Sequence, residues 1–378
     1  MFRNLKQWGR WLAIAVGIGL LCSVVALAAK PPKLAYQVLQ LDLVDQGGVA
    51  YAESCAVDIS DQGQVAGYVL DASGGCLPAC WTISTVGGEV HSELNLLRQE
   101  STIDAAAQGI NENGEIVGVG TKPDGQMVGL YWADEGAVPQ ELPRLVDHDE
   151  SWAYAINKNG VICGVSVSDF EERAVVWRVR EGVFECGPVE LLPSQSHARA
   201  VALSDNDINR VARVVGAPFV PGGMPQSAVA WTVLDGDETL QVVDCVVLND
   251  LGLASARGVN NDGAVCGWIQ TETTREAVVW SGDLSQTLSI PRLYCEPAAF
   301  DINNKGVIVG TAANTKTTAP RAVIWSSVSA SMVVLDQFLD DDSPFGILCD
   351  ASAVNDSGTI VGGGWDGTGC TAFLAVRR

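Results

Sequence analysis

The residues able to do chemistry are few in this 378-residue sequence, and they are widely spaced. The three histidines, His91, His148 and His197, show no HExxH pairing and no spacing that suits zinc. The GxSxG elbow, the P-loop and a GxGxxG turn between a strand and a helix are also absent. We therefore predict no catalytic residue, no metal ligand and no cofactor, and we interpret the histidines as solvated loop residues.

Acidic side chains offer two further candidates. Asp58 and Asp301 occupy the same position of an internal repeat, and paired carboxylates could serve a glycosidase or a lyase. We interpret these two aspartates instead as residues bonded to neighbouring backbone. Arg257, in the first strand of another copy, is the third polar candidate of this kind. The run 340–342 consists of three aspartates and is a candidate calcium site, which we interpret as a solvated charge run.

Aromatic residues at strand ends are the stronger lead. Trp152 precedes a strand, Trp268 and Tyr68 follow equivalent glycines of the repeat, and Trp365 lies three residues beyond another such glycine. We predict that all four lie on one rim of the molecule. Their ring faces could stack on sugars or anchor a protein partner, whereas the alternative is that they pack between the structural units.

One phrase recurs seven times and must position these residues. It reads Ala, three residues, Asn or Ser, two residues, Gly, a short apolar run and Gly, with closing glycines 43 to 52 residues apart. This period suits a four-stranded propeller blade. The copies are Ala56 to Gly67, Ala107 to Gly118, Ala153 to Gly164, Ala200 to Gly216, Ala256 to Gly267, Ala299 to Gly310 and Ala351 to Gly362.

Each copy predicts the strands of one blade. Alternation within the first strand places the Ala, the residue two further on and the Asn on one face. A polar turn that ends in Gly predicts a hairpin with a type I turn and a bulge, and a third strand ends in Trp in six copies. The segment 36–43 has the pattern of a fourth strand but follows no earlier blade. The segment 371–376 has the pattern of a third strand and is not followed by a fourth. We predict an all-β, seven-bladed β-propeller in residues 36–378, its ring closed by this N-terminal strand.

The N-terminal residues 1–28 differ from the rest. Arg3, Lys6 and Arg10 precede the apolar run Trp11 to Ala29, which ends in the small-residue tripeptide 26–28. This order predicts a signal peptide, with an uncleaved N-terminal anchor as the alternative. We expect a secreted, periplasmic or cell-surface protein that contacts a membrane only if this segment is retained.

Charge and cysteines agree with such a location. A net charge of −22 repels nucleic acid, so a nucleic-acid partner is excluded. Ten cysteines follow the signal segment, and two pairs occupy matching places in their repeats, 21 residues apart: Cys55 with Cys76, and Cys349 with Cys370. We interpret these two pairs as candidate disulfides.

The repeat also resembles a known family. The string 258–267, GVNNDGAVCG, and the later Thr371-Ala372-Phe373-Leu374 are similar to the HAF repeat, also called the probable extracellular repeat. The resemblance covers about residues 52 to 376. It departs from the pattern where Arg173, Glu276, Arg321 and Thr371 replace a His. It implies a secreted or surface protein with a propeller-like fold, and it implies no catalytic residues.

Two functions follow from these observations. The first is a non-enzymatic propeller that binds a protein or polysaccharide partner through the rim that carries the long loops. The alternative is a carbohydrate-active or other hydrolytic enzyme with its active site at the mouth of the axial channel.

Overall fold

The computed structural model describes residues 35–169, 171–191, 197–205, 210–219, 225–237, 239–249, 252–282 and 284–378. Residues 36–377 form one compact unit. The predicted signal segment, 1–28, lies outside the described residues. Within the described part of the chain, no helix has the length and apolar character needed to cross a bilayer.

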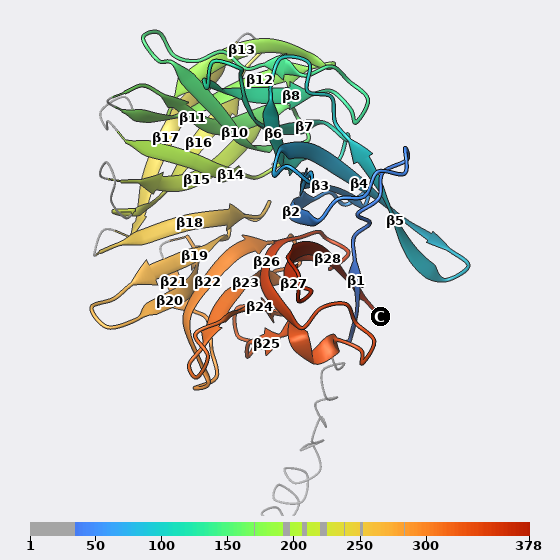
Figure 1. Cartoon of the computed structure of the whole chain (residues 1–378). Coiled ribbons are helices and arrows are strands. Elements are labelled where there is room, and N and C mark those ends of the chain that lie inside the picture. The colour runs from blue at the N-terminus through green and yellow to red at the C-terminus, as the bar shows by residue number, and fades with distance from the viewer. Residues whose placement is uncertain are drawn as a thin grey trace, which may run out of the picture. The chain divides into compact units, whose positions relative to one another are not determined.

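The described chain forms seven antiparallel sheets of four strands arranged in a ring (Figure 1). Blade 1 contains β2 (Glu53–Ile59), β3 (Gln64–Leu70), β4 (Cys76–Val86) and β5 (Glu89–Leu96), and blade 2 contains β6 (Asp104–Ile110), β7 (Ile116–Thr121), β8 (Met127–Trp132) and β9 (Gln140–Glu141). Blade 3 contains β10 (Glu150–Ile156), β11 (Val161–Val167), β12 (Glu172–Arg180) and β13 (Val183–Glu190), and blade 4 contains β14 (Ala198–Leu203), β15 (Val211–Pro218), β16 (Ala228–Asp235) and β17 (Leu240–Asn249).

The remaining blades repeat this order. Blade 5 contains β18 (Ala254–Val259), β19 (Val265–Gln270), β20 (Arg275–Ser281) and β21 (Leu284–Thr287), and blade 6 contains β22 (Tyr294–Ile302), β23 (Ile308–Asn314), β24 (Pro320–Trp325) and β25 (Val333–Val334). Blade 7 contains β26 (Ile347–Val354), β27 (Ile360–Trp365) and β28 (Cys370–Arg377), and a short 3-10 helix, η1 (Leu335–Phe338), precedes it.

The ring is closed by its N-terminal strand, as predicted. β1 (Tyr36–Gln40) pairs with β28 as the fourth strand of blade 7, in a register that runs from Tyr36 opposite Arg377 to Gln40 opposite Phe373. The predicted seven-bladed all-β propeller is confirmed. Pairing at this point leaves β28 without a free edge.

Two rims of the ring differ. The first hairpin of every blade lies on one edge, which we call the turn rim. In blade 1 the N–H of Gly63 donates to the carbonyl of Ser60 at 3.1 Å, and Gly63 has a φ of 81°. The opposite edge, which we call the loop rim, carries the links between second and third strands, such as 71–75. This link has five residues, because β3 ends at Leu70 and β4 begins at Cys76.

A bulge that the repeat pattern does not reveal interrupts the first strand of every blade. In blade 1, Ala56 is opposite Gly67 and Asp58 is opposite Ala66, so Val57 is an extra residue that bulges from the ladder. The prediction of strict alternation along this strand is therefore wrong. The equivalent bulged residues are Val57, Gln108, Tyr154, Val201, Arg257, Phe300 and Ser352.

The closing glycine of the repeat is explained by this bulge. A Cβ added to Gly67 would lie 2.0 Å from the carbonyl oxygen of Cys55, and one added to Gly164 would lie 2.0 Å from that of Trp152. The other five closing glycines show the same approach, at 1.9 to 2.1 Å. Only glycine fits there, because backbone atoms cannot move aside as a flexible side chain can.

The repeated Asn joins neighbouring blades. Its side-chain amide donates to the matching backbone carbonyl of the next blade, for example from Asn303 to Asn355 at 2.8 Å and from Asn355 to Ser60 at 3.1 Å, across the closure. Its side-chain oxygen accepts N–H groups of its own turn, such as that of Val307 at 2.9 Å. The same clamp is made from Asn111, Asn157 and Asn260.

The repeated Trp residues are core, as expected. All six are at most 3% exposed: Trp81, Trp132, Trp177, Trp231, Trp280 and Trp325. Four donate their indole N–H to the segment that leaves the preceding blade, as Trp81 does to the carbonyl of Asp42 at 2.8 Å. In blade 7 the matching register position is held by Ala375.

We expect Asn303→Ala to lower the free energy of unfolding by about 2 kcal/mol, because it removes a buried clamp and leaves turn N–H groups without an acceptor. Urea denaturation measures the change. Asn314→Ala is the control, since Asn314 makes one exposed side-chain hydrogen bond and should change stability by about 0.5 kcal/mol or less. Equal effects of the two substitutions would contradict a role for the clamp.

Candidate ligand-binding site

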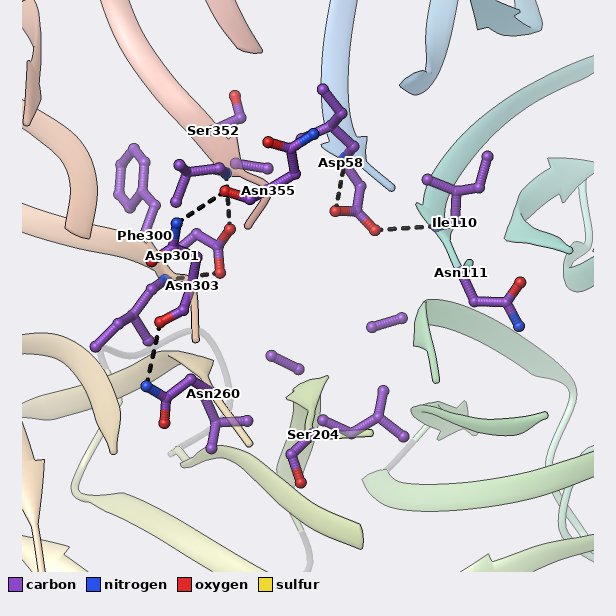
Figure 2. A pocket seen from close by; sticks show the side chains of 18 of the residues that line it. Asp58, Ile110, Asn111, Ser204, Asn260, Phe300, Asp301, Asn303, Ser352 and Asn355 are labelled. Carbon is purple, nitrogen blue, oxygen red and sulfur yellow. Dashed lines mark hydrogen bonds between the residues drawn. The ribbon is translucent and has the colours of Figure 1, made fainter. Parts of the chain in front are cut away.

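The inner strands of the seven blades surround a channel with a volume of about 620 Å³. Every blade contributes to its lining, and Figure 2 shows the hollow between the inner strands with Asp58, Phe300, Asp301 and Ser352 around it. An aliphatic residue of each blade also lines it: Ile59, Ile110, Ile156, Leu203, Val259, Ile302 and Val354.

The turn-rim mouth is lined by side-chain oxygens that already have partners. The N–H of Asp205 donates to Asn261 Oδ1 at 2.8 Å, and that of Asn261 to Asn304 Oδ1 at 2.8 Å. Four further backbone N–H groups donate in the same way to a side-chain oxygen of the following blade: Asp61 to Glu112, Lys158 to Asp205, Asn304 to Asp356 and Asp356 to Asp61. In blade 3 the position holds Lys158, and because an ammonium group contains no acceptor atom, it cannot accept an N–H group as the oxygens of the other blades do. This belt joins the blades and leaves a mouth rich in carboxylates.

Asp58 and Asp301, the two aspartates that share a position of the repeat, both line the channel. Asp58 accepts N–H groups from Ile59 at 2.8 Å and, in the next blade, from Ile110 at 2.9 Å. Asp301 accepts the corresponding pair from Ile302 and Val354, at 2.8 and 2.9 Å. The interpretation that they bond neighbouring backbone agrees with these contacts. Each carboxylate uses both oxygens to join two blades.

The environment shifts the ionisation of these carboxyls. Burial, followed by the charge of Asp301, raises the pKa of Asp58 to about 7, although its two N–H partners act in the opposite direction. Burial also raises the pKa of Asp301. Raised values of this kind suit a general acid, but each carboxylate already holds two N–H groups, and none of the bonds described joins one carboxyl to the other.

The loop-rim half of the channel carries a different chemistry. Four consecutive blades supply Tyr154, Arg199, Arg257 and Phe300, which we call the cationic arc. The Arg257 guanidinium lies 5.6 Å from the centre of the Phe300 ring. Tyr154 is half-buried, and burial raises its pKa to about 12, whereas the charges of Arg199 and Arg257 lower it. Aromatic faces and cations therefore meet around one mouth.

The predicted rim aromatics do not form one exposed group. Trp152 is half-buried beside the arc, 6.5 Å from the Tyr154 ring, with the Arg199 guanidinium 5.4 Å from its own centre. Trp268 is only 7% exposed, and the Arg275 guanidinium covers it at 4.6 Å. The expectation of an exposed ring is thus wrong for Trp268, because this cation packs on it.

Tyr68 and Trp365 differ from that pair. Tyr68 is half-buried, and its hydroxyl forms a hydrogen bond with the thiol of Cys55. Trp365, at the end of β27, is 46% exposed. Of the four predicted aromatics, Trp365 alone presents an open ring on the rim, and Trp152 alone lies beside the cationic arc.

All ten described cysteines are free thiols, so neither Cys55–Cys76 nor Cys349–Cys370 forms a bridge in the structure. Burial raises the pKa of the Cys55 and Cys76 thiols to about 11, which disfavours the reactive thiolate. The sequence spacing identified matching positions in two blades but could not define the orientation of the side chains.

The expectation of solvated side chains holds for the aspartate run 340–342 and for His91, but not for His148. The residues of 340–342 are exposed, and so is His91 in β5, which lies in a strand rather than in a loop. His148 is buried instead, with its Nε2 3.4 Å from Glu171 Oε1, and His197 is half-buried against Phe219. Among the described residues, no group of three or more His, Cys, Asp or Glu is placed to hold a metal ion.

Sequence reasoning missed Tyr154 and Phe300. Both directly follow the repeated Ala, a position that alternation assigned to the face away from the Ala and that the bulge turns toward the channel. A signal was present in the sequence. This position varies among the seven copies while its neighbours repeat, which is typical of functional residues carried on a constant scaffold.

The chain is similar to several solved structures. A puromycin-hydrolyzing peptidase of Mycobacterium tuberculosis aligns at 13% identity and a TM-score of 0.50, over 82% of this chain and 50% of the peptidase. AofleA of Arthrobotrys oligospora aligns at 10% identity and a TM-score of 0.40, over 80% and 90% of the two chains. A lectin of Aleuria aurantia in complex with alpha-methyl-L-fucoside gives 9% identity and a TM-score of 0.40, over 78% and 99%. At these identities the likeness concerns the fold alone, and the sequence matches no family model and no curated protein.

The raised pKa of Asp58 predicts a pH effect. Because its folded-state value, about 7, lies above the ordinary 3.8, its contribution to stability is fully present below about pH 3.8 and is lost as the pH rises through 7. We expect the free energy of unfolding of the wild-type protein to fall over this range relative to that of Asp58→Asn. Urea denaturation across the pH range measures this difference in slope.

Asp71→Asn is the control with the opposite sign. Hydrogen bonds from Ser73 and Gly75 lower the pKa of Asp71, so its contribution is lost only as the pH falls below about 4. Asp58→Asn also removes one N–H acceptor, which lowers stability at every pH and leaves the slope to report on ionisation. Parallel profiles of the wild-type protein and Asp58→Asn would refute the pKa assignment.

Proposed function

We propose that this protein is a non-enzymatic β-propeller, secreted or held at the cell surface, that binds a glycan at the loop-rim mouth of its channel. The observation that carries the proposal is the ring of bulged residues. Seven blades with the same backbone each direct one variable side chain into the same half of the channel. A repeated frame with variable side chains at one opening is suited to recognition.

The chemistry of this mouth suits sugars. Tyr154 and Phe300 offer ring faces for the apolar side of a pyranose, and Gln108 and Ser352, two further bulged residues, offer polar groups for its hydroxyls. Trp152 stands beside Tyr154, so an extended chain could continue from the channel toward the rim. On the rim itself, the exposed ring of Trp365 provides a second contact.

A hydrolytic enzyme at the channel mouth is less well supported. Its two candidate carboxylates, Asp58 and Asp301, already hold backbone N–H groups of two blades each. Moving either side chain toward a substrate would leave those N–H groups without partners, which is costly in a buried setting. Binding requires no such change.

The HAF-repeat resemblance and the predicted signal segment support a location outside the cytoplasm. We expect N-terminal sequencing of the protein recovered from the exported fraction to begin at residue 29 or 30, because the small-residue tripeptide 26–28 suits signal peptidase. A mature chain that retains residues 1–28 and sediments with membranes would identify the segment as an anchor instead.

We expect the wild-type protein to be retained on at least one column of a panel of immobilised polysaccharides. Tyr154→Ala and Phe300→Ala should each weaken retention at least about tenfold, since truncating an aromatic anchor removes most of its contact energy. Thermal denaturation checks that both variants remain folded.

Trp365→Ala separates the channel mouth from the outer rim. If it abolishes retention while Tyr154→Ala has no effect, the rim is the site and the channel assignment is wrong. Absence of wild-type retention on the whole panel, together with capture of a protein from envelope extract, would replace the glycan by a protein partner.

A further inference from the structure

The two mouths of the channel have opposite electrostatic character. Four of the seven belt residues at the turn rim are carboxylic acids: Asp61, Glu112, Asp205 and Asp356. At the loop rim, Arg199 and Arg257 line the channel in a protein whose net charge is −22. This axial asymmetry favours an anionic group at the loop rim and disfavours one at the turn rim.

Arg199 and Arg257 differ in their partners. Arg199 forms a bidentate pair with Glu172, with Nη2 to Oε1 at 2.9 Å and Nε to Oε2 at 2.5 Å, so its charge is matched. No described residue accepts a hydrogen bond from the Arg257 guanidinium or forms a salt bridge with it, and no carboxylate contributes to its pKa. Its described neighbours are the Phe300 ring, Tyr154, the thiol of Cys266 and a second cation, Arg275.

The setting of Arg257 makes the missing partner significant. Its side chain is exposed to the channel that it lines, and partial desolvation by the channel wall lowers the pKa of the guanidinium. A channel-lining guanidinium without a carboxylate partner among the described residues is available to pair with an anionic ligand. Five N–H donors in a planar fork, held at a channel mouth, match the geometry of a carboxylate.

Resting on the proposed function, we infer that the glycan recognised at the loop-rim mouth is acidic and that Arg257 binds the carboxylate of a uronic acid residue. The sugar ring stacks on Tyr154 and Phe300 while its carboxylate accepts two N–H bonds from the Arg257 guanidinium. Arg199, already paired with Glu172, borders the site and adds no free charge.

The test compares two probes of identical sugar skeleton. Oligogalacturonate carries a carboxylate on every residue, and its methyl ester is uncharged. In calorimetric titration we expect the wild-type protein to bind oligogalacturonate at least about tenfold more tightly than the ester, since a charge-assisted bidentate pair is lost with the ester. Arg257→Gln should lose that preference, with the two probes bound equally weakly.

Two further variants serve as controls. Arg292→Gln makes the same change of charge at an exposed position in the segment between β21 and β22, and should keep the preference. Arg257→Lys keeps the positive charge but lacks the planar guanidinium, so it should retain only part of the preference for oligogalacturonate over the ester. Because Arg257 lacks a carboxylate partner, Arg257→Gln should not lower the thermal midpoint. A lowered midpoint would show that Arg257 stabilises the fold.

The outcomes separate this inference from the proposed function. Equal wild-type affinity for both probes, or an acid preference that survives in Arg257→Gln, overturns the carboxylate assignment while glycan binding stands. Retention of the wild-type protein only on neutral polysaccharides also overturns the carboxylate assignment and leaves glycan binding in place. Failure on every polysaccharide in the panel overturns the proposed function, and the inference with it.

Discussion

The close approach between the closing glycine of each repeat and the backbone of the neighbouring strand is the constraint on which this propeller depends. In all seven blades a Cβ at that position would meet a carbonyl oxygen at about 2 Å, so the first two strands can pair in this way only through glycine. The bulge that produces this contact places one additional residue on the channel side of every first strand. The most uniform feature of the repeat therefore creates its most variable surface.

Polar groups at the inner strands mainly hold the blades together. Repeated Asn amides reach across five of the seven seams, the belt of side-chain oxygens crosses six, and Asp58 and Asp301 reinforce one seam each. An isolated blade buries too little apolar surface to be stable, so these bonds and the Trp cores at the blade interfaces act together. A polar residue in such a channel is consequently structural unless its partners are missing.

That criterion distinguishes the two ends of the channel. The carboxylates of the turn rim accept N–H groups from the preceding blade, whereas Arg257 at the loop rim has no comparable partner among the described residues. The aromatic faces of Tyr154 and Phe300 lie at the same end. The proposed binding site thus lies where the repeat leaves side chains free, on a frame whose own polar groups are largely bonded between blades.

The sequence by itself determined the number of blades, the hairpins and the closure of the ring, because these depend on local patterns that recur at a fixed period and on the complementarity of the two chain ends. It also singled out Asp58, Asp301 and Arg257 as polar residues of the first strands, although only the two aspartates hold equivalent positions and Arg257 occupies the bulged position before them. It could not reveal that Trp268 is covered by Arg275, that Asp58 binds the next blade or that Tyr154 and Phe300 face the channel. These properties arise from a bulge and from contacts between blades, and residues distant in the sequence meet there only when the ring is assembled.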